Sequence, residues 1–418
     1  MDQNKLFNLA NNNVHQNEKI VVFGVGGGGG NALNHIIESG VQGVDFVAAN
    51  TDARALDMSQ APNKIILGEA LTRGLGAGAN PQVGANAAKE SSDKIKEYIT
   101  GADMLFVTAG MGGGTGTGAA PVIAELAKDM NVLVVGVVTK PFGFEMGKRM
   151  NTAIEGINQL KKNVYALLIV ENDRLLQMDN GVKIKIIDAY KKVDEVLRQA
   201  VQGVTDLITK NGFINLDFAD IKAILTNAGT AIMGMGEGEG EDRAKKAAQN
   251  AITSPLMTFP VTGAKGILLN VTTGSEITLG EMSDAAQIIE ETADPDAQVI
   301  WGHVIDESLG DKVHVTLIAT FPEDGRERPK IISKSTADDS QKQTQTPKTQ
   351  QPPRAPVQPP QPPRINTLYD AYTKKRRAQE GFEEARLTQP ANDEHSVFPG
   401  MQRKPYDQPA FFRKNLKD

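Results

Sequence analysis

Two glycine-rich clusters in the first third of the chain have the composition of anion-binding loops: GVGGGGGN at 24–31 and GMGGGTGTGAAP at 110–121. Glycine loses more conformational entropy on folding than any other residue, so such dense clusters indicate that a ligand comes close to the backbone. Each cluster follows an apolar run and precedes a helical pattern. Backbone N–H groups at a helix start can converge on an anion, and the helix dipole favours negative charge there. Together the clusters predict a phosphate-bearing ligand held from two sides.

Two known phosphate-binding motifs can be compared with these clusters. Residues 24–29 contain a literal G-x-G-x-x-G, and Asp52 follows Gly29 by 23 residues, near the position of the ribose-binding acid in dinucleotide folds. An NAD-dependent oxidoreductase is therefore one alternative, although that fold needs only one such loop. A P-loop enzyme needs G-x-x-x-x-G-K-[ST], and neither cluster contains the lysine. A triphosphate held by backbone groups, with Thr115 and Thr117 as hydroxyl donors, fits the pattern better.

Two pairs of charged residues could act on such a ligand. Asp217 and Asp220, in NLDFAD, lie three residues apart at the start of a helical pattern and could share a face. Asp217 could instead cap the helix, as aspartate often does. Glu145 and Arg149 are four residues apart, which also suits a surface ion pair. Spacing alone leaves both interpretations of each pair open.

The elements that must position these residues alternate along the chain. Apolar runs at 19–25, 44–51, 104–109, 131–139 and 163–172 predict buried strands, with helical patterns between them. This alternation predicts an α/β fold, with a Rossmann-like parallel sheet covered by helices on both faces.

A long amphipathic helix is predicted next. Apolar residues repeat every three or four positions from Ile184 to Ile208, which predicts one helix of about 25 residues and about 37 Å. This length suits a helix that connects two domains. Beyond it, a second, smaller α/β domain is predicted from strands at 264–274, 297–306 and 312–321 and a helix at 279–293.

Composition excludes several classes of protein. The 418-residue chain has no cysteine, which removes disulfides, iron–sulfur clusters and thiol catalysis, and its five histidines lack metal-ligand spacing. It has no run of 18 apolar residues and a polar N-terminus, so we expect a cytoplasmic protein without direct membrane insertion. Residues 331–418 hold 15 Lys and Arg against 10 Asp and Glu, which leaves 30 against 41 in the rest of the chain. This acidic body argues against nucleic acid as a partner.

The chain changes character near residue 330. Twelve of its 21 prolines but only two of its 41 glycines lie beyond that point, and residues 341–364 are polar and proline-rich. Such a segment has little to bury, so we expect a disordered linker. The last residues, YDQPAFFRKNLKD, regain aromatic and basic side chains, which is typical of a short tethered recognition motif.

Five motifs in consistent order connect these observations. The stretch GGGTGTG at 112–118 is the signature of the tubulin superfamily, and it is accompanied by GVGGGGGNA, AANTDARAL, KPFGFEMGKR and NLDFADI. Over residues 19–320, and again at the extreme C-terminus, the chain resembles the FtsZ family of bacterial cell-division GTPases. The resemblance implies a GTPase that binds GTP or GDP with Mg²⁺, polymerises head-to-tail and forms the cytokinetic ring at midcell. A nucleotide-regulated scaffold that does not hydrolyse GTP is the other alternative.

The resemblance also implies roles for individual residues of the loops. Both glycine loops would bind phosphates, and Glu145 and Arg149 would lie near the ribose and the phosphates. The loop residues implied are Gly27, Gly28, Gly29, Gly30, Asn31, Gly114, Thr115 and Gly116.

Guanine would be recognised by Asn172 and Asp194, with Glu195 as the alternative to Asp194. A carboxylate suits guanine, because it can accept hydrogen bonds from N1–H and the exocyclic amine, a donor pair that adenine lacks. The ring of Tyr190 would lie near the base or, alternatively, pack in the core.

Hydrolysis is implied to need two subunits. Asp217 and Asp220, supported by Asn215, would reach the next subunit's nucleotide and orient or polarise the attacking water. From Asp194 to Ile208 the long helix extends about 21 Å, so the loop beyond it should lie far from its own pocket. Mg²⁺ would be held mainly by phosphates and waters, without a protein metal site.

The C-terminal stretch DQPAFFRKN resembles the peptide by which this family docks on membrane-tethering division proteins, with Pro409, Phe411, Phe412 and Arg413 as contacts. The expected organisation is a flexible extension (1–18), a GTP-binding domain (19–183), a connecting helix (184–210), a second α/β activation domain (211–325), a linker (326–405) and the peptide (406–418).

Overall fold

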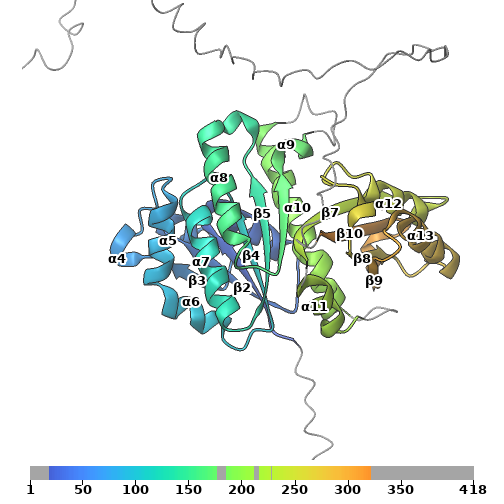
Figure 1. Ribbon diagram of the computed structural model, residues 1–418, viewed down its shortest axis with the longest axis horizontal. Coiled ribbons are helices and arrows are strands. Elements are labelled where there is room, and N and C mark those ends of the chain that lie inside the picture. The colour runs from blue at the N-terminus through green and yellow to red at the C-terminus, as the bar shows by residue number, and fades with distance from the viewer. Residues whose placement is uncertain (1–17, 177–184, 211–215, 227, 322–418) are drawn as a thin grey trace, which may run out of the picture. The chain divides into compact units, whose positions relative to one another are not determined.

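The computed structural model describes residues 18–176, 185–210, 216–226 and 228–321, which build one ten-stranded sheet with helices packed against it (Figure 1). The strand order is β3-β2-β1-β4-β5-β6-β7-β10-β8-β9. Neighbouring described strands are parallel except where β10 pairs with β7 and β8. The strands are β1 (Ile20–Val25), β2 (Val44–Asn50), β3 (Asn63–Ile66), β4 (Met104–Gly110), β5 (Leu133–Lys140), β6 (Ala166–Glu171), β7 (Gly229–Gly238), β8 (Gly266–Thr273), β9 (Gln298–Ile305) and β10 (Val313–Phe321).

Helices cover both faces of this sheet, which confirms the predicted α/β fold class. Side chains alternate between the faces of a strand. In β1, Ile20 and Val22 pack with α2 and α10, whereas Val21 and Phe23 pack with α5 to α8. The helices are α2 (Gly26–Glu38), α3 (Ala53–Asp57), α4 (Glu69–Thr72), α5 (Pro81–Glu90), α6 (Ser92–Ile99), α7 (Thr115–Asp129), α8 (Gly147–Leu160), α9 (Asn172–Leu175), α10 (Ile186–Thr209), α11 (Phe218–Thr226), α12 (Arg243–Ile252) and α13 (Leu279–Thr292), with 3-10 helices η1 (Gly143–Glu145), η2 (Val261–Gly263) and η3 (Glu307–Leu309).

The long helix predicted from the apolar repeat is present as α10. Its 24 residues extend about 36 Å. Its buried face includes Val193, Leu197 and Val204, and it shares a hydrophobic core both with α2 and with Leu268 of β8 and Ile318 of β10. The helix therefore contacts both halves of the sheet.

The second α/β part continues the first sheet rather than forming a separate one. The connection is β7, which the sequence pattern did not predict and which pairs with β6 and β10. A Cβ on Gly234, Gly236 or Gly238 would lie 2.1 Å or less from a backbone oxygen of α12. The glycines of β7 therefore serve the close packing of this helix on the strand.

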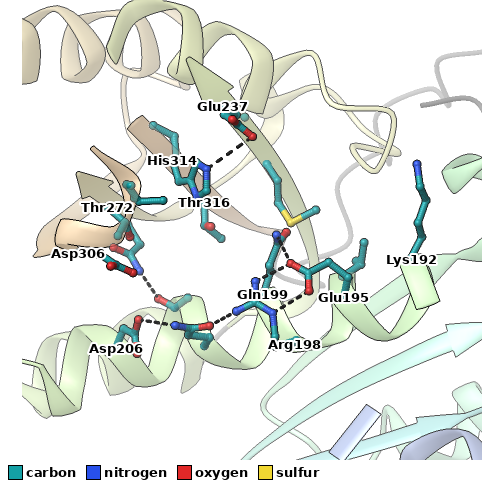
Figure 2. Close-up of a pocket in the computed structure, with 18 of the residues that line it drawn as sticks. Lys192, Glu195, Arg198, Gln199, Asp206, Glu237, Thr272, Asp306, His314 and Thr316 are labelled. Atoms are coloured by element: carbon teal, nitrogen blue, oxygen red, sulfur yellow. Dashed lines mark hydrogen bonds and ion pairs between the residues drawn. The ribbon is translucent and has the colours of Figure 1, made fainter. Parts of the chain in front are cut away.

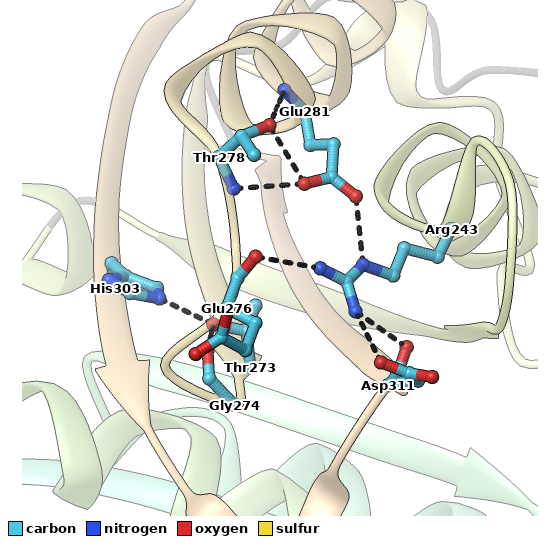
Figure 3. A network of polar contacts seen from close by, with 8 residues as sticks. All are labelled: Arg243, Thr273, Gly274, Glu276, Thr278, Glu281, His303 and Asp311. Atoms are coloured by element: carbon cyan, nitrogen blue, oxygen red, sulfur yellow. Dashed lines mark hydrogen bonds and ion pairs between the residues drawn. The ribbon is translucent and has the colours of Figure 1, made fainter.

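One polar network fixes the helices of this second part (Figure 3). Arg243 of α12 donates to Glu281 (Nε–Oε1 2.8 Å), to the Glu276 carbonyl oxygen (3.0 Å) and to Asp311 Oδ1 (3.3 Å). Glu281 also closes a capping box with Thr278 at the start of α13. Burial opposes ionisation of Glu281, but hydrogen bonds from Arg243 and Thr278 hold its pKa below the usual value. The network ties α12 to the start of α13 and to the turn before β10.

Some predictions fall outside the described residues. These are the linker (326–405), the C-terminal peptide with Pro409, Phe411, Phe412 and Arg413, the N-terminal extension apart from Glu18, and Asn215. In the part of the chain that the structure describes, no helix is long and apolar enough to cross a membrane.

Candidate nucleotide site

The two glycine loops meet at the carboxyl edge of the sheet. They follow β1 and β4, which are neighbouring parallel strands, and each opens a helix, α2 at Gly26 and α7 at Thr115. A Cβ on Gly26 would lie 2.7 Å from Gly116 N, and one on Gly28 would lie 3.1 Å from Gly110 Cα. The loops thus contact each other through their backbones. Helix α2 begins inside the glycine cluster, earlier than the sequence pattern predicted.

The glycines of the first loop serve two purposes. A Cβ on Gly29 would lie 2.3 Å from the Thr108 carbonyl oxygen, so the missing side chain lets α2 pack on β4. Gly27 and Gly30, by contrast, have nothing within 4 Å of the Cβ position. With the exposed Asn31 they line a cavity of about 190 Å³, completed by residues of β2 and α3. A ligand can approach the loop backbone from this side.

The threonines of the second loop differ in environment. Thr115 is half-buried, and its Oγ1 lies 2.6 Å from Thr51 Oγ1. Thr117 is 2% exposed, and its hydroxyl accepts a hydrogen bond from Gly112 N at 2.9 Å. Thr117 therefore helps to shape the loop through this bond.

Asp52 follows β2 and serves as a helix cap. Its carboxylate caps α3 by accepting hydrogen bonds from Arg54 N (2.9 Å) and Ala55 N (3.4 Å). This carboxylate is therefore already engaged by the backbone of α3.

Glu145 and Arg149 form an ion pair beside the second loop. Arg149 Nε lies 3.2 Å from Glu145 Oε2, and Glu145 Oε1 accepts from Phe142 N at 2.9 Å. The two residues do not share one helix, because Glu145 ends η1, Met146 has a φ of 77°, and Arg149 lies in α8. A Cβ on Gly112 would lie 2.7 Å from Arg149 Cγ, so the arginine packs directly on the signature loop.

Three aromatic rings lie next to this ion pair. Phe142 stacks on Phe144 with 5.2 Å between centroids and meets Tyr190 edge-on at 5.3 Å. Tyr190, on α10, is 40% exposed, so it is not a core residue. Burial, then the charge of Glu145 and a hydrogen bond to it, raise the pKa of the Tyr190 hydroxyl. The rings form an apolar platform at the edge of the site.

Asn172 opens α9 directly after β6, at the same edge of the sheet. It is 4% exposed, and its Oδ1 has no hydrogen-bond partner among the described residues. A buried acceptor left unpaired costs about 1–3 kcal/mol, so this oxygen has the capacity to accept from a ligand. The adjacent Asp173 accepts from Gly143 N at 3.0 Å and so ties α9 to η1.

Two adjacent carboxylates on α10 have opposite environments. Glu195 accepts hydrogen bonds from Arg198 Nε (2.8 Å), Gln199 Nε2 (2.6 Å) and His35 Nε2 (2.9 Å). Burial opposes its ionisation, but the bonds from Arg198 and His35 hold its pKa below the usual value. For Asp194, burial raises the pKa to about 6, only partly offset by the charge of His35. Within the described residues no hydrogen bond to the Asp194 carboxylate is present.

From Glu195 a ladder of polar side chains continues along α10 (Figure 2). Arg198 donates to Gln202, Gln202 Nε2 lies 3.0 Å from Asp206 Oδ2, and Lys210 Nζ lies 2.9 Å from the same oxygen. The ladder lines a cavity of about 480 Å³ between α10 and strands β7, β8 and β10. Side-chain contacts therefore continue along α10 from Glu195 to Lys210 at the C-terminal end of the helix.

The two predicted catalytic aspartates lie at that far end. Asp217 directly precedes α11 and Asp220 lies in its first turn; both are exposed. Asp217 Oδ1 accepts a hydrogen bond from Asp220 N at 2.8 Å, which confirms the expected cap. Figure 1 shows α9, which Asn172 opens, and α11 at opposite ends of α10, and about 22 Å of helix separates Asp194 from Thr209. The structure does not bring the aspartates to the glycine loops of the same chain.

Comparison with known proteins identifies both parts of the chain. The profile of the Tubulin/FtsZ family GTPase domain matches residues 19–180, and that of the FtsZ family C-terminal domain matches residues 229–321. An empty FtsZ dimer from M. jannaschii is 42% identical over 77% of this chain and 92% of that chain, with a TM-score of 0.71. The chain belongs to the FtsZ family. A mutant FtsZ from the same organism gives 42% identity, 77% and 96% coverage, and a TM-score of 0.72.

More distant structures share the fold alone. CetZ2 from Haloferax volcanii, solved as a GTPγS-bound protofilament, is 21% identical over 73% of this chain and 94% of that chain, with a TM-score of 0.61.

As an FtsZ-family member the chain is a GTP-binding GTPase that polymerises into protofilaments in cell division. The expected family, fold and enzymatic class are confirmed, and both the NAD-dependent enzyme and the non-hydrolysing scaffold are wrong.

Sequence reasoning missed three residues that contact predicted site residues of this FtsZ-family chain or, for Asp173, the 3-10 helix that carries Glu145. They are His35, Thr51 and Asp173, which reach Glu195, Thr115 and Gly143 respectively. Asp173 had a signal in the sequence because it adjoins Asn172, whereas the other two act from elements that are distant along the chain. Across the described residues, no group of three His, Asp or Glu side chains could hold a metal ion.

Proposed function

We propose that GTP binds across the two glycine loops, with its phosphates on the backbone of residues 27–31 and 114–116. The support is geometric: two helix starts adjoin at one sheet edge, and Gly27 and Gly30 leave the loop backbone open on the cavity side. The donors here are N–H groups, which suit an anion. Glu145 and Arg149, packed on the second loop, are assigned to the ribose and the phosphates.

Guanine recognition is assigned to Asn172 and Asp194. Asn172 offers a buried acceptor without a partner, and Asp194 offers a carboxylate that no described hydrogen bond engages. Glu195 is the weaker choice, because three donors already occupy its oxygens. Tyr190, half-exposed on the same helix, is placed near the base.

Catalysis is assigned to a composite site between consecutive subunits, with Asp217 and Asp220 of one chain acting at the nucleotide of the next. The observation that carries this proposal is the separation of the exposed aspartates from the glycine loops by the length of α10. The aspartates orient and polarise the attacking water, and Asn215 supports their loop. Mg²⁺ would be held mainly by phosphates and waters and would supply charge neutralisation at the phosphates. An arrangement that repeats head-to-tail does not close and so extends as a filament.

The test mixes two defective variants. Gly27→Glu places a carboxylate on the open face of the first loop and should abolish nucleotide binding without disturbing packing, because nothing lies within 4 Å of its Cβ. Asp217→Ala keeps the binding loops intact. Phosphate release from GTP, with ATP as a control, is measured for each variant alone and for the mixture across protein concentrations. Activity of the mixture, absent from either variant alone, is the expected result.

The matched control is a mixture of Asp217→Ala with Asp220→Ala. Both substitutions lie at the same end of the subunit, so every interface in the filament contains one of them. This mixture should therefore remain inactive. If the first mixture stays inactive although the variants copolymerise, or if wild-type specific activity does not rise with concentration, the composite site is wrong.

We further propose that the C-terminal peptide, with Pro409, Phe411, Phe412 and Arg413, binds membrane-tethering division proteins and so places filaments at midcell in the cytoplasm. Its aromatic pair and basic flank at the end of a long proline-rich stretch support this role. Deletion of residues 406–418 should leave GTP hydrolysis unchanged and abolish recruitment to the division site. Recruitment that persists after the deletion would place the contact elsewhere.

A further inference from the structure

His35 joins the helix of the first glycine loop to the helix that carries Asp194. It lies in the last turn of α2, and its Nε2 is 2.9 Å from Glu195 Oε2 on α10. The Glu195 carboxylate is ionised and can only accept, so His35 Nε2 carries a proton and donates. The hydrogen bond spans 160 residues of sequence and connects the two helices on which we place phosphate and base recognition.

The same imidazole acts on Asp194. Burial disfavours the charge of the Asp194 carboxylate, and His35 is the group whose charge favours it. Arg198, another cation on α10, is engaged by Glu195 at 2.8 Å and 2.5 Å and donates to Gln202 as well. An aspartate reads guanine as an acceptor pair only while it is ionised. His35 therefore stands where it can control whether Asp194 is in the state that binds.

We propose that His35 is a positioning residue for guanine recognition, which fixes α10 against α2 through Glu195 and keeps the Asp194 carboxylate ionised. This proposal rests on the assignment of Asp194 to the base. It adds a specificity-determining residue outside the five motifs, on the face of α2 directed toward α10.

The other charged groups around this pair have partners or face solvent. On α2, Glu38 is bonded to Gln60. On α10, Glu195 and Arg198 form the network described above, Lys191 is exposed, and Lys192 lines the neighbouring cavity. Asp194 is affected by burial and by His35 alone among the described residues, which makes His35 the residue to vary.

The experiment measures GDP affinity from pH 5.5 to 8.0 on the full chain, because GDP separates binding from hydrolysis. Three variants of His35 and Asp194 are compared with the wild type. His35→Gln keeps a hydrogen-bond donor for Glu195 but removes the charge, His35→Arg supplies a permanent charge, and Asp194→Asn removes the carboxylate. IDP, which lacks the exocyclic amine, is measured in parallel to isolate the contact with that group.

We expect the GDP affinity of the wild type to decrease as the pH drops below about 6, because Asp194 becomes protonated. In His35→Gln the midpoint of this fall should move upward by about half a pH unit or more, because a nearby positive charge is lost. In His35→Arg it should lie at or below the wild-type midpoint, and the preference for GDP over IDP should survive at pH 6. Asp194→Asn should bind weakly at all pH values, without the midpoint.

The outcomes separate the two proposals. If Asp194→Asn keeps wild-type GDP affinity and pH dependence, Asp194 does not read the base, and the assignment on which this inference rests is wrong. If Asp194→Asn behaves as expected but His35→Gln keeps the wild-type midpoint, His35 has no role in recognition beyond packing, and only the further inference is wrong. A uniform loss of affinity in His35→Gln without a shifted midpoint also contradicts it.

Discussion

The two alanine substitutions Gly27→Ala and Gly29→Ala should have opposite effects on stability, although the two glycines lie two residues apart in one loop. At Gly27 the added methyl meets nothing within 4 Å. Alanine there lowers the entropy of the unfolded chain and favours the helix, so the free energy of unfolding without nucleotide should rise by about 0.5 kcal/mol. At Gly29 the methyl would lie 2.3 Å from the Thr108 carbonyl oxygen, which belongs to a central strand and cannot move aside. Overpacking of this kind should lower the free energy of unfolding by about 2–3 kcal/mol.

The effects of the two substitutions on GDP binding should have the reverse order, with Gly27→Ala the more damaging. The methyl of Gly27→Ala projects to the side from which phosphates approach, so GDP affinity should fall about tenfold or more, equivalent to about 1.4 kcal/mol. Urea unfolding is followed by circular dichroism, because the single tryptophan, Trp301, lies in β9 and reports on the second part of the sheet. GDP titration of folded protein gives the affinity. A Gly27→Ala protein that is destabilised like Gly29→Ala, or that binds GDP like the wild type, would refute the division of the loop into open and packed glycines.

Three further predictions concern other parts of the molecule. Asp217→Ala should keep wild-type GDP affinity and lose at least about 100-fold in phosphate release, and turnover near the wild-type rate would exclude this carboxylate from catalysis. Burial raises the pKa of Asp194 in the folded chain to about 6, above the usual value for an aspartate, so the folded chain holds this proton more tightly and stability falls as pH rises from about 4 to about 6. Asp194→Asn should therefore unfold at higher urea concentration than the wild type above pH 6, with the difference vanishing toward pH 4, and equal midpoints at pH 7.5 would contradict the burial argument. Arg243→Leu leaves the half-buried Glu281 without its cation and should cost about 2 kcal/mol of stability with unchanged GDP affinity, which urea unfolding and GDP titration will check; a change in affinity would mean that the network extends to the nucleotide site.

The sequence was most informative where one physical signal dominated a segment. Apolar runs predicted β1, β2, β4, β5 and β6 because fully buried parallel strands are apolar on both faces. The repeat from Ile184 to Ile208 predicted α10 because an amphipathic helix of this length leaves a regular pattern. The two glycine loops were predicted to be neighbours for the same reason, since they follow strands of one parallel sheet.

Elements shaped by contacts between distant segments were not predictable. Strand β7 carries glycines at alternate positions, which resemble a loop until α12 is seen to pack on them. Helix α2 begins among glycines because Gly26 and Gly29 must fit against the second loop and β4. The different environments of Asp194 and Glu195 depend on His35, 160 residues from Glu195, and no local pattern could have distinguished these adjacent carboxylates.

The narrowest connection in the sheet determines how a filament of these subunits carries mechanical load. Strands β6 and β7 are joined by three residue pairs, Ala166–Leu168 with Gly229–Ala231, whereas β4 and β5 share seven and β8 and β9 share eight. Within the sheet, tension that pulls the two halves of a subunit apart is therefore resisted by these three residue pairs. Helix α10 also resists it, because the helix packs on both halves of the sheet. Bending should concentrate at this joint and leave the loops on β1 and β4 undistorted, so that a subunit can yield while its nucleotide site keeps its geometry.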